Sequence, residues 1–203
     1  MAKWNEQQQE IKNFIEKTLV RRLKRDQKEL KILSEGDLQS CVYYHLRKKI
    51  KKMPNWHLLN KLPMGEKEED KKIPDIAIAY LNYDGETVYP KFIIELKESI
   101  QPLSNSSKKG YKKDIQKLNL LIKKHNKKIS KTYFILAVLP IPGRTGTSKT
   151  SIMWPTKDIE KSIHENKLHS KIQTFVINTQ YDKHGRINNS FMKKVKLLRK
   201  FRE

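Results

Sequence analysis

The fold is decided by two stretches of the chain, Ile73-Pro-Asp-Ile-Ala-Ile-Ala-Tyr80 and Phe92-Ile-Ile-Glu-Leu-Lys97. Both are short, apolar and rich in β-branched residues, which is the composition of buried strands. The interval between them contains the turn-forming pair Asp84-Gly85. We therefore predict that the two stretches form an antiparallel hairpin.

The register of this hairpin decides whether its charged residues meet. Side chains alternate along a strand, so Glu95 and Lys97 share one face, while the apolar residues beside them point into the core. Asp75 lies directly opposite Glu95 if the loop has three residues or if one strand carries a β-bulge. A two-residue Asp-Gly loop without a bulge would miss that register by one residue.

Pro74-Asp75 and Glu95-Leu96-Lys97 together resemble the motif of the restriction-endonuclease-like, or PD-(D/E)xK, superfamily of nucleases. The resemblance implies a metal-dependent endonuclease that hydrolyses phosphodiester bonds in DNA. It implies that Asp75 and Glu95 hold Mg²⁺, with Mn²⁺ as an alternative, that the backbone carbonyl of Leu96 adds a ligand, and that Lys97 orients or activates the attacking water. Hard cations prefer oxygen ligands, and a bound cation lowers the pKa of its water.

The triplet pattern alone is common in this Lys-rich chain, since Glu10-Ile-Lys12 and Asp70-Lys-Lys72 also satisfy it. Those triplets have polar or helical surroundings. Glu95 and Lys97 instead lie in a strand pattern that follows a strand-borne Pro-Asp, and structural context is what gives a motif its meaning. The alternative interpretation is a cross-strand ion pair on an exposed face of the sheet.

A further carboxylate, Glu35, begins a predicted helix. Ser34-Glu-Gly-Asp37 opens this helix as a capping box, and Asp37 is explained by the cap. The buried stripe of the helix follows at Leu38, Val42, Leu46 and Ile50. Glu35 falls on the inward side, where a carboxylate needs a partner. In the resembled family a first-helix glutamate often completes the metal site, and Glu35 matches that position; alternatively, Glu35 favours the positive end of the helix dipole.

The chain has 203 residues and a formal net charge of +22. This length suits one domain, and a positive charge of this size predicts a polyanionic partner, with DNA fitting best. Lys greatly outnumbers Arg, which favours phosphate contacts over base reading. The alternative is a Lys-rich bias that serves solubility or thermostability.

Cys41 is the single cysteine, so we expect no disulfide framework and a reducing, cytoplasmic or nucleoid-associated setting rather than secretion. No secretory leader or membrane-spanning run is visible, so we expect no membrane association. The resembled family leads us to expect a homodimer, since cutting two strands with one site per chain favours a pair.

The remaining periodicities predict a single α/β domain with a mixed central β-sheet flanked by helices, which is the restriction-endonuclease-like core. We divide it into an N-terminal helical arm (1–33), the α/β core (34–178) and a C-terminal basic helix (186–203). Further strands are expected at Trp56–Leu62, Lys131–Leu139 and Thr174–Asn178, and further helices at Glu6–Arg25, Tyr111–Lys124, Thr156–His164 and Phe191–Phe201. The first of these helices is either an arm that lies along a phosphate backbone or packs on a second subunit, or an ordinary amphipathic surface helix.

Basic and polar residues after the hairpin are candidates for DNA contacts. They are Lys108, Lys109, Lys112, Lys113, Gln116, Lys117, Arg144 and Lys149. The last two belong to the loop Gly143–Thr150, which comes within one residue of a phosphate-binding P-loop. Trp154-Pro155 interrupts any helix that could follow it, so the loop suits contacts to a DNA backbone better than nucleotide hydrolysis.

Besides nucleotide hydrolysis, two function classes therefore remain open. The first is a Mg²⁺-dependent deoxyribonuclease that uses Asp75, Glu95 and Lys97, with Glu35 behind them. The second is a non-catalytic nucleic-acid-binding protein that uses a basic α/β surface. Metal dependence separates the two classes, because a binding module should ignore a chelator.

Overall fold

The computed structural model describes residues 2–62, 64, 73–81, 88–100, 105–139, 169–181 and 187–194. Its strands, in chain order, are β1 (Trp56–Asn60), β2 (Ile76–Leu81), β3 (Val88–Ile100), β4 (Lys131–Leu139), β5 (Ile172–Tyr181) and β6 (Ile187–Lys194). They form one sheet in the same order. Its helices are α1 (Ala2–Asn13), the π-helical segment η1 (Phe14–Leu19), α2 (Val20–Lys28), α3 (Glu35–Ile50) and α4 (Asn105–His125).

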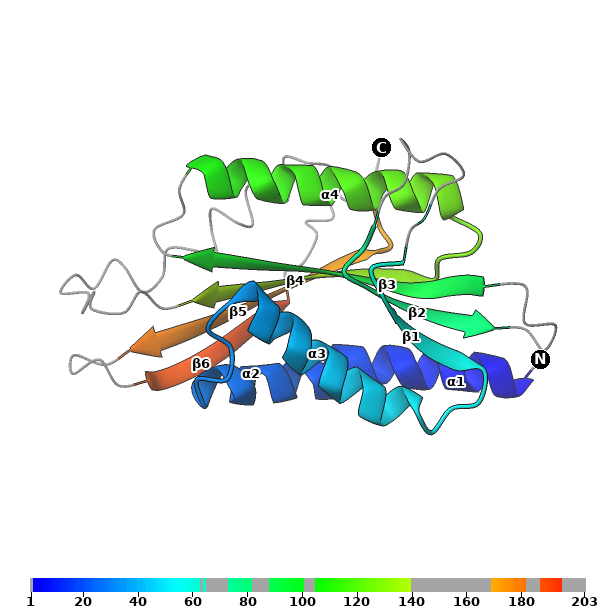
Figure 1. Ribbon diagram of the computed structural model, residues 1–203, viewed down its shortest axis with the longest axis horizontal. Coiled ribbons are helices and arrows are strands. Elements are labelled where there is room, and N and C mark those ends of the chain that lie inside the picture. The colour runs from blue at the N-terminus through cyan, green and yellow to red at the C-terminus, as the bar shows by residue number, and fades with distance from the viewer. Residues whose placement is uncertain are drawn as a thin grey trace.

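The sheet is mixed and has helices on both faces (Figure 1). The β3–β4 and β4–β5 pairs are parallel, and the other three pairs are antiparallel. α4 follows β3 and covers one face, while α1, α2 and α3 lie on the other face (Figure 1). The predicted α/β fold with a mixed, helix-flanked sheet is therefore confirmed.

The hairpin of β2 and β3 contains the β-bulge on which the predicted register depends. Ile78 pairs with Phe92, but the next residue, Ala79, pairs with Pro90, so Lys91 is the extra residue. On the other side of the bulge, Ile76 pairs with Ile94. Continuing that register by one residue puts Asp75 opposite Glu95, as the sequence predicted for a bulged hairpin.

The N-terminal helical segment belongs to the core. Ile11, Ile15, Leu19 and Leu23 have no exposed surface and pack with residues of the sheet in one hydrophobic cluster. Burying four large aliphatic side chains stabilises the folded chain by about 1.5–3 kcal/mol each. The segment that we called an arm is thus a packed layer of the domain, and its apolar spacing reflects that packing.

The predicted C-terminal helix is wrong where the structure describes it. Residues 187–194 form β6, which pairs antiparallel with β5. A backbone edge on β5 offers hydrogen bonds along the whole strand, and such tertiary pairing overrides a helical spacing of apolar residues. The sheet therefore extends past residue 178, where we had ended the core. The rest of the predicted helix, 195–203, and the predicted Thr156–His164 helix lie outside the described residues.

Candidate functional site

Glu95 and Lys97 of β3 lie on the face of the sheet that α4 covers. Ile93 packs in a cluster with Leu118 and Ile122 of α4. Glu95 and Lys97 follow Ile93 at steps of two, so strand alternation places them on this same face. Glu95 is only 3% exposed. The alternative of an ion pair on an exposed sheet face therefore does not describe this residue.

Asp75 reaches Glu95 from the position directly before β2. Its Oδ2 atom accepts a hydrogen bond of 2.7 Å from the backbone N–H of Leu96. Its carbonyl oxygen accepts one of 3.1 Å from the backbone N–H of Lys61. These two contacts hold the carboxylate beside β3. Burial raises the pKa of Asp75 above its ordinary value, against the lowering effect of the Leu96 hydrogen bond.

Glu35 comes to the same place from the first turn of α3. Its Oε2 atom accepts a hydrogen bond of 3.3 Å from the backbone N–H of Glu98 and lies 3.4 Å from Lys97 Nζ. Asp37 instead completes the cap, since its backbone N–H donates to Ser34 Oγ at 3.1 Å. The two acids of this turn therefore have different partners, and only Glu35 faces β3.

Lys97 lies between two carboxylates. Its Nζ atom is 3.4 Å from Glu35 Oε2 and 3.9 Å from Asp114 Oδ2, which comes from α4. Partial burial opposes its charge, but Glu35 and Asp114 outweigh that effect and raise the pKa of Lys97. Lys97 therefore stays protonated in this arrangement.

Lys117 comes to the same place from α4. Its Nζ atom pairs with Glu95 Oε1 and donates a hydrogen bond of 3.3 Å to the carbonyl oxygen of Ile73. The sequence had suggested Lys117 as a DNA contact, but the structure turns it inward, onto a carboxylate. We call the six residues that meet here the acidic cluster: Glu35, Asp75, Glu95, Lys97, Asp114 and Lys117.

Asp114 was not predicted from the sequence. The available signal was its position on α4, directly before the buried Ile115 and one turn before Lys117, in a helix otherwise rich in lysine. Burial raises the pKa of Asp114, while Lys97 and Lys117 lower it less. It adds a fourth carboxylate to the three that the sequence had brought together.

The other predicted DNA contacts do not join this cluster. Lys112, Lys113 and Gln116 have exposed side chains on α4. The side chains of Lys108 and Lys109 lie outside the described part of the chain, as do Arg144 and Lys149 with the P-loop-like segment. These residues stay predictions.

The acidic cluster contains four carboxylates and two lysines, and Glu95 is its buried member. Burial, and then the nearby carboxylate of Asp75, raise the pKa of Glu95 to about 7. Two buried carboxylate oxygens, Glu95 Oε2 and Asp114 Oδ2, have no hydrogen-bond partner. The Glu95 oxygen is a suitable ligand for a hard cation such as Mg²⁺, whereas Asp114 Oδ2 is the oxygen that lies 3.9 Å from Lys97 Nζ. The donor atoms thus fit the metal that the sequence resemblance implies.

The carboxylates are nevertheless not arranged around a common centre. Within the ranges that the structure describes, no three His, Cys, Asp or Glu side chains are grouped so that they could hold a metal ion. Lys117 pairs with Glu95. Lys97 lies between Glu35 and Asp114 and so separates these two carboxylates. The four-ligand set of Asp75, Glu95, Leu96 and Glu35 therefore stays a prediction.

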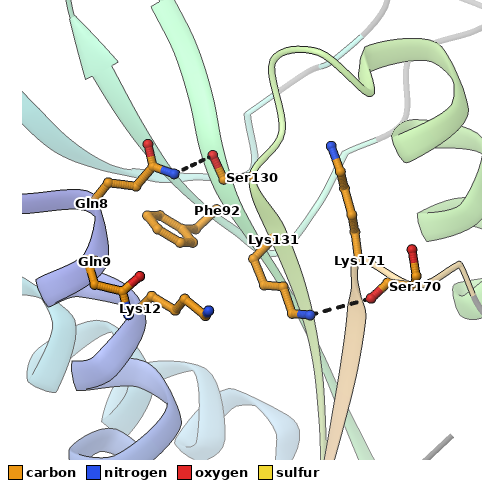
Figure 2. A pocket seen from close by; sticks show the side chains of 8 residues that line it. All are labelled: Gln8, Gln9, Lys12, Phe92, Ser130, Lys131, Ser170 and Lys171. Atoms are coloured by element: carbon orange, nitrogen blue, oxygen red, sulfur yellow. Dashed lines mark hydrogen bonds between the residues drawn. The ribbon is translucent and has the colours of Figure 1, made fainter. Parts of the chain in front are cut away.

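A second polar region lies at the starts of β4 and β5. It is a pocket lined by Gln8, Gln9, Lys12, Phe92, Ser130, Lys131, Ser170 and Lys171 (Figure 2). We call it the lysine pocket. Gln8 donates to Ser130 Oγ at 2.8 Å, and Lys131 donates to the carbonyl oxygen of Ser170 at 3.4 Å. Three of its lining residues are lysines and none is acidic, so it carries positive charge on the α1 side of the sheet.

Among the described helices, none has the length and apolar character that crossing a membrane would require.

Comparison with known proteins adds little. No protein-family model matches the chain, and no curated protein matches its sequence. Among solved structures, it is similar to Pyrococcus furiosus SfsA in complex with Ca²⁺, with a TM-score of 0.32 and 10% sequence identity. The match covers 77% of this chain and 62% of that one, so this chain spans less than two thirds of its neighbour's length. A likeness this weak carries no functional argument, which must rest on the site itself.

Proposed function

We propose that this protein is a metal-dependent nuclease that hydrolyses phosphodiester bonds in DNA. The observation that carries the proposal is the meeting of Glu35, Asp75 and the Glu95–Lys97 pair, which come from three separate segments of the chain, around the buried Glu95. The bulge at Lys91 sets the register that this meeting requires. A structural ion pair needs no such convergence, and burying a carboxylate such as Glu95 is costly unless it has a function or full compensation.

The proposed roles follow from the position of each residue. Asp75 and Glu95 would hold the cation, with the backbone carbonyl of Leu96 and Glu35 as further ligands. A bound Mg²⁺ would polarise the phosphoryl group and lower the pKa of a water ligand. Lys97, kept protonated by Glu35 and Asp114, would place a positive charge beside the phosphate and orient the water. The Leu96 N–H holds Asp75 in place through its hydrogen bond.

DNA is the proposed substrate because of the charge of the chain. A formal net charge of +22 attracts a polyanion, and most lysine contacts would go to phosphates. Binding should then be strongly salt-dependent and weakly sequence-dependent. A homodimer, which would cut both strands of a duplex, stays an expectation from the resembled family.

The test is a cleavage assay on supercoiled, linear, branched and single-stranded DNA with Mg²⁺, Mn²⁺ or EDTA. We expect cutting with either metal, no cutting with EDTA, and no cutting by an Asp75→Ala protein that still binds DNA. The matched control is Asp37→Asn, because Asp37 caps α3 and faces away from the cluster. Full cleavage by Asp75→Ala would remove the assignment.

The second candidate is a non-catalytic nucleic-acid-binding module. It is favoured by the absence of a preassembled metal-binding group in the described ranges and by the lysine pairing of Glu95. In that case the acidic cluster would be a buried structural network. Tight, salt-sensitive DNA binding that ignores both EDTA and the Asp75→Ala change would select this candidate.

A further inference from the structure

We propose that Lys117 is the resident counter-ion of the acidic cluster, and that a divalent cation binds there by displacing the Lys117 ammonium group from Glu95. This inference rests on the part of the proposed function that places a cation at Asp75 and Glu95. It assigns to Lys117 a competition with metal in place of the DNA contact suggested by the sequence.

The first observation is the position of the ammonium group. Lys117 Nζ pairs with Glu95 Oε1, and it also donates to the Ile73 carbonyl oxygen, two residues before Asp75. Lys117 thus contacts both segments that carry the proposed metal ligands. A cation coordinated by Glu95 Oε1 would take the place now occupied by the ammonium group.

The second observation is that Lys117 does not compensate the cluster fully. The Glu95 side chain is 5% exposed, and its other oxygen, Oε2, has no hydrogen-bond partner. Asp75 lies beside it and is itself desolvated. A single ammonium charge therefore serves the buried Glu95 and the half-buried Asp75, whereas a divalent cation would supply twice that charge and could bind the Glu95 oxygen that has no hydrogen bond.

The third observation is that Lys117 can leave while Lys97 is held. The Lys117 side chain is 22% exposed and sits on a long, flexible stem, so it can extend into solvent. Lys97 lies between Glu35 and Asp114, whereas the ion pair of Lys117 is with Glu95 and its charge acts on Asp114 only at longer range. Metal binding would therefore change the partners of one lysine and leave those of the other.

The competition explains two features that otherwise conflict. The cluster has the oxygen donors of a cation site, yet the described side chains form no preassembled metal-binding group. If Lys117 holds the carboxylates in the metal-free protein, both features are expected. Metal affinity should then include the cost of breaking the Lys117–Glu95 pair.

The test measures metal binding directly in the full chain, by titration calorimetry with Mn²⁺ and Mg²⁺ and by thermal unfolding with and without metal. Lys117→Met removes the competitor and keeps most of the side-chain volume. We expect Mn²⁺ to bind Lys117→Met about tenfold more tightly or better, because a charge-assisted hydrogen bond no longer has to be broken. Without metal, its Tm should fall by roughly 5–10 °C, because a buried carboxylate loses its partner.

Two further variants keep the result interpretable. Lys113→Met makes the same change at an exposed position of α4 and should leave Mn²⁺ affinity and Tm near the wild-type values. Lys117→Arg keeps the charge and offers a forked donor to the carboxylate, so it should bind Mn²⁺ more weakly than wild type. If Lys117→Met does not fold, the weaker binding of Lys117→Arg still tests the competition.

Equal Mn²⁺ affinity in wild type, Lys117→Met and Lys117→Arg would overturn the proposal, as would tighter binding by the Lys113→Met control to the same degree. Absence of Mn²⁺ binding in all four proteins would overturn it together with the cation site. Metal binding with the predicted order of affinities, but without DNA cleavage, would support the role of Lys117 and reject the nuclease assignment.

Discussion

The acidic cluster and the lysine pocket use the same residue type in opposite ways. In the acidic cluster, Lys97 and Lys117 lie within 4 Å of carboxylates from α3, α4 and β3. In the lysine pocket, Lys131 and Lys171 donate to backbone carbonyl oxygens, and no acidic residue lines the walls. The first region places its lysines against carboxylates, and the second places Lys131 and Lys171 against backbone carbonyl oxygens.

The electrostatics of the two regions follow this difference. Carboxylates raise the pKa of Lys97 despite its partial burial. Near the lysine pocket, burial and then the charge of Lys171 lower the pKa of Lys91. From the net charge alone, all of these lysines would be expected to contact DNA. Their neighbours in the fold divide them into lysines that face carboxylates and lysines that face backbone carbonyl oxygens.

The largest expected effect is the loss of cleavage in Glu95→Ala. Removing a ligand of a catalytic cation should cost several kcal/mol of transition-state stabilisation, or about 10²–10³-fold in kcat. Duplex DNA binding should stay close to wild type, since phosphate contacts elsewhere carry the affinity. Kinetics and fluorescence anisotropy on one preparation measure both. Joint loss of cleavage and binding would instead indicate that the domain had unfolded.

The next effect is on stability, through Glu95→Gln. Burial and Asp75 raise the Glu95 pKa from 4.5 to about 7 in the folded protein. The folded state therefore holds the Glu95 proton more tightly than the unfolded state. The cost of ionising Glu95 in the folded protein is absent below about pH 4.5, grows up to about pH 7 and is complete above it. Glu95→Gln should remove a penalty on the order of 3 kcal/mol at pH 8. Urea unfolding at pH 5 and pH 8 measures it.

Exposed Glu6 provides the control for that experiment. Glu6→Gln should change neither the stability nor its pH dependence by more than a few tenths of a kcal/mol. A Glu95→Gln protein that keeps the wild-type loss of stability between pH 5 and pH 8 would show that Glu95 is not the group responsible.

A smaller effect tests the lysine pocket. Lys12→Ala combined with Lys131→Ala should weaken DNA binding similarly for unrelated sequences, because phosphates carry no sequence information. The slope of log affinity against log salt should fall in magnitude by roughly 2, one for each lost phosphate contact. The matched control is Lys123→Ala with Lys124→Ala on the exposed face of α4. Identical slopes for both double variants would mean that the pocket has no special role.

The smallest effect is expected from Asp114→Asn. Asp114 lies 3.9 Å from Lys97 and acts on any reaction only by positioning that lysine, so kcat should fall about tenfold or less. The pH profile of kcat should shift on its alkaline side, because Lys97 loses one of the carboxylates that keep it protonated. A change in KM alone, with an unchanged pH profile, would contradict this positioning role.

Much of the fold could be read from local patterns. The apolar runs of β2, β3 and β4 and the spacing of Ile115, Leu118 and Ile122 in α4 predict buried strands and an amphipathic helix. The prediction of a C-terminal helix failed because the apolar spacing near Phe191 favours a helix, whereas pairing with β5 makes residues 187–194 a strand. That pairing is a long-range interaction, which a local pattern does not reveal. The start of α4 at Asn105 was also missed, since a polar segment carries no periodic signal.

The residues of the candidate site likewise divide into those that local sequence patterns predict and those that only the fold brings in. The sequence determined Asp75, Glu95 and Lys97, because strand alternation and the Pro-Asp context are local properties of the chain. Glu35 could be suggested from its place in the first turn of a helix. The structure alone decided that Asp114 joins the cluster and that Lys117 turns towards Glu95.

The sequence by itself therefore determined the strands, the overall charge and the residues that carry the motif, because these depend on composition and on neighbours along the chain. The tertiary structure decided the register, through the bulge at Lys91, and it decided which lysines meet carboxylates. The physical reason is that the energy of a charge depends on its desolvation and on partners within a few ångströms, and these partners are brought together only by packing α3 and α4 against the sheet.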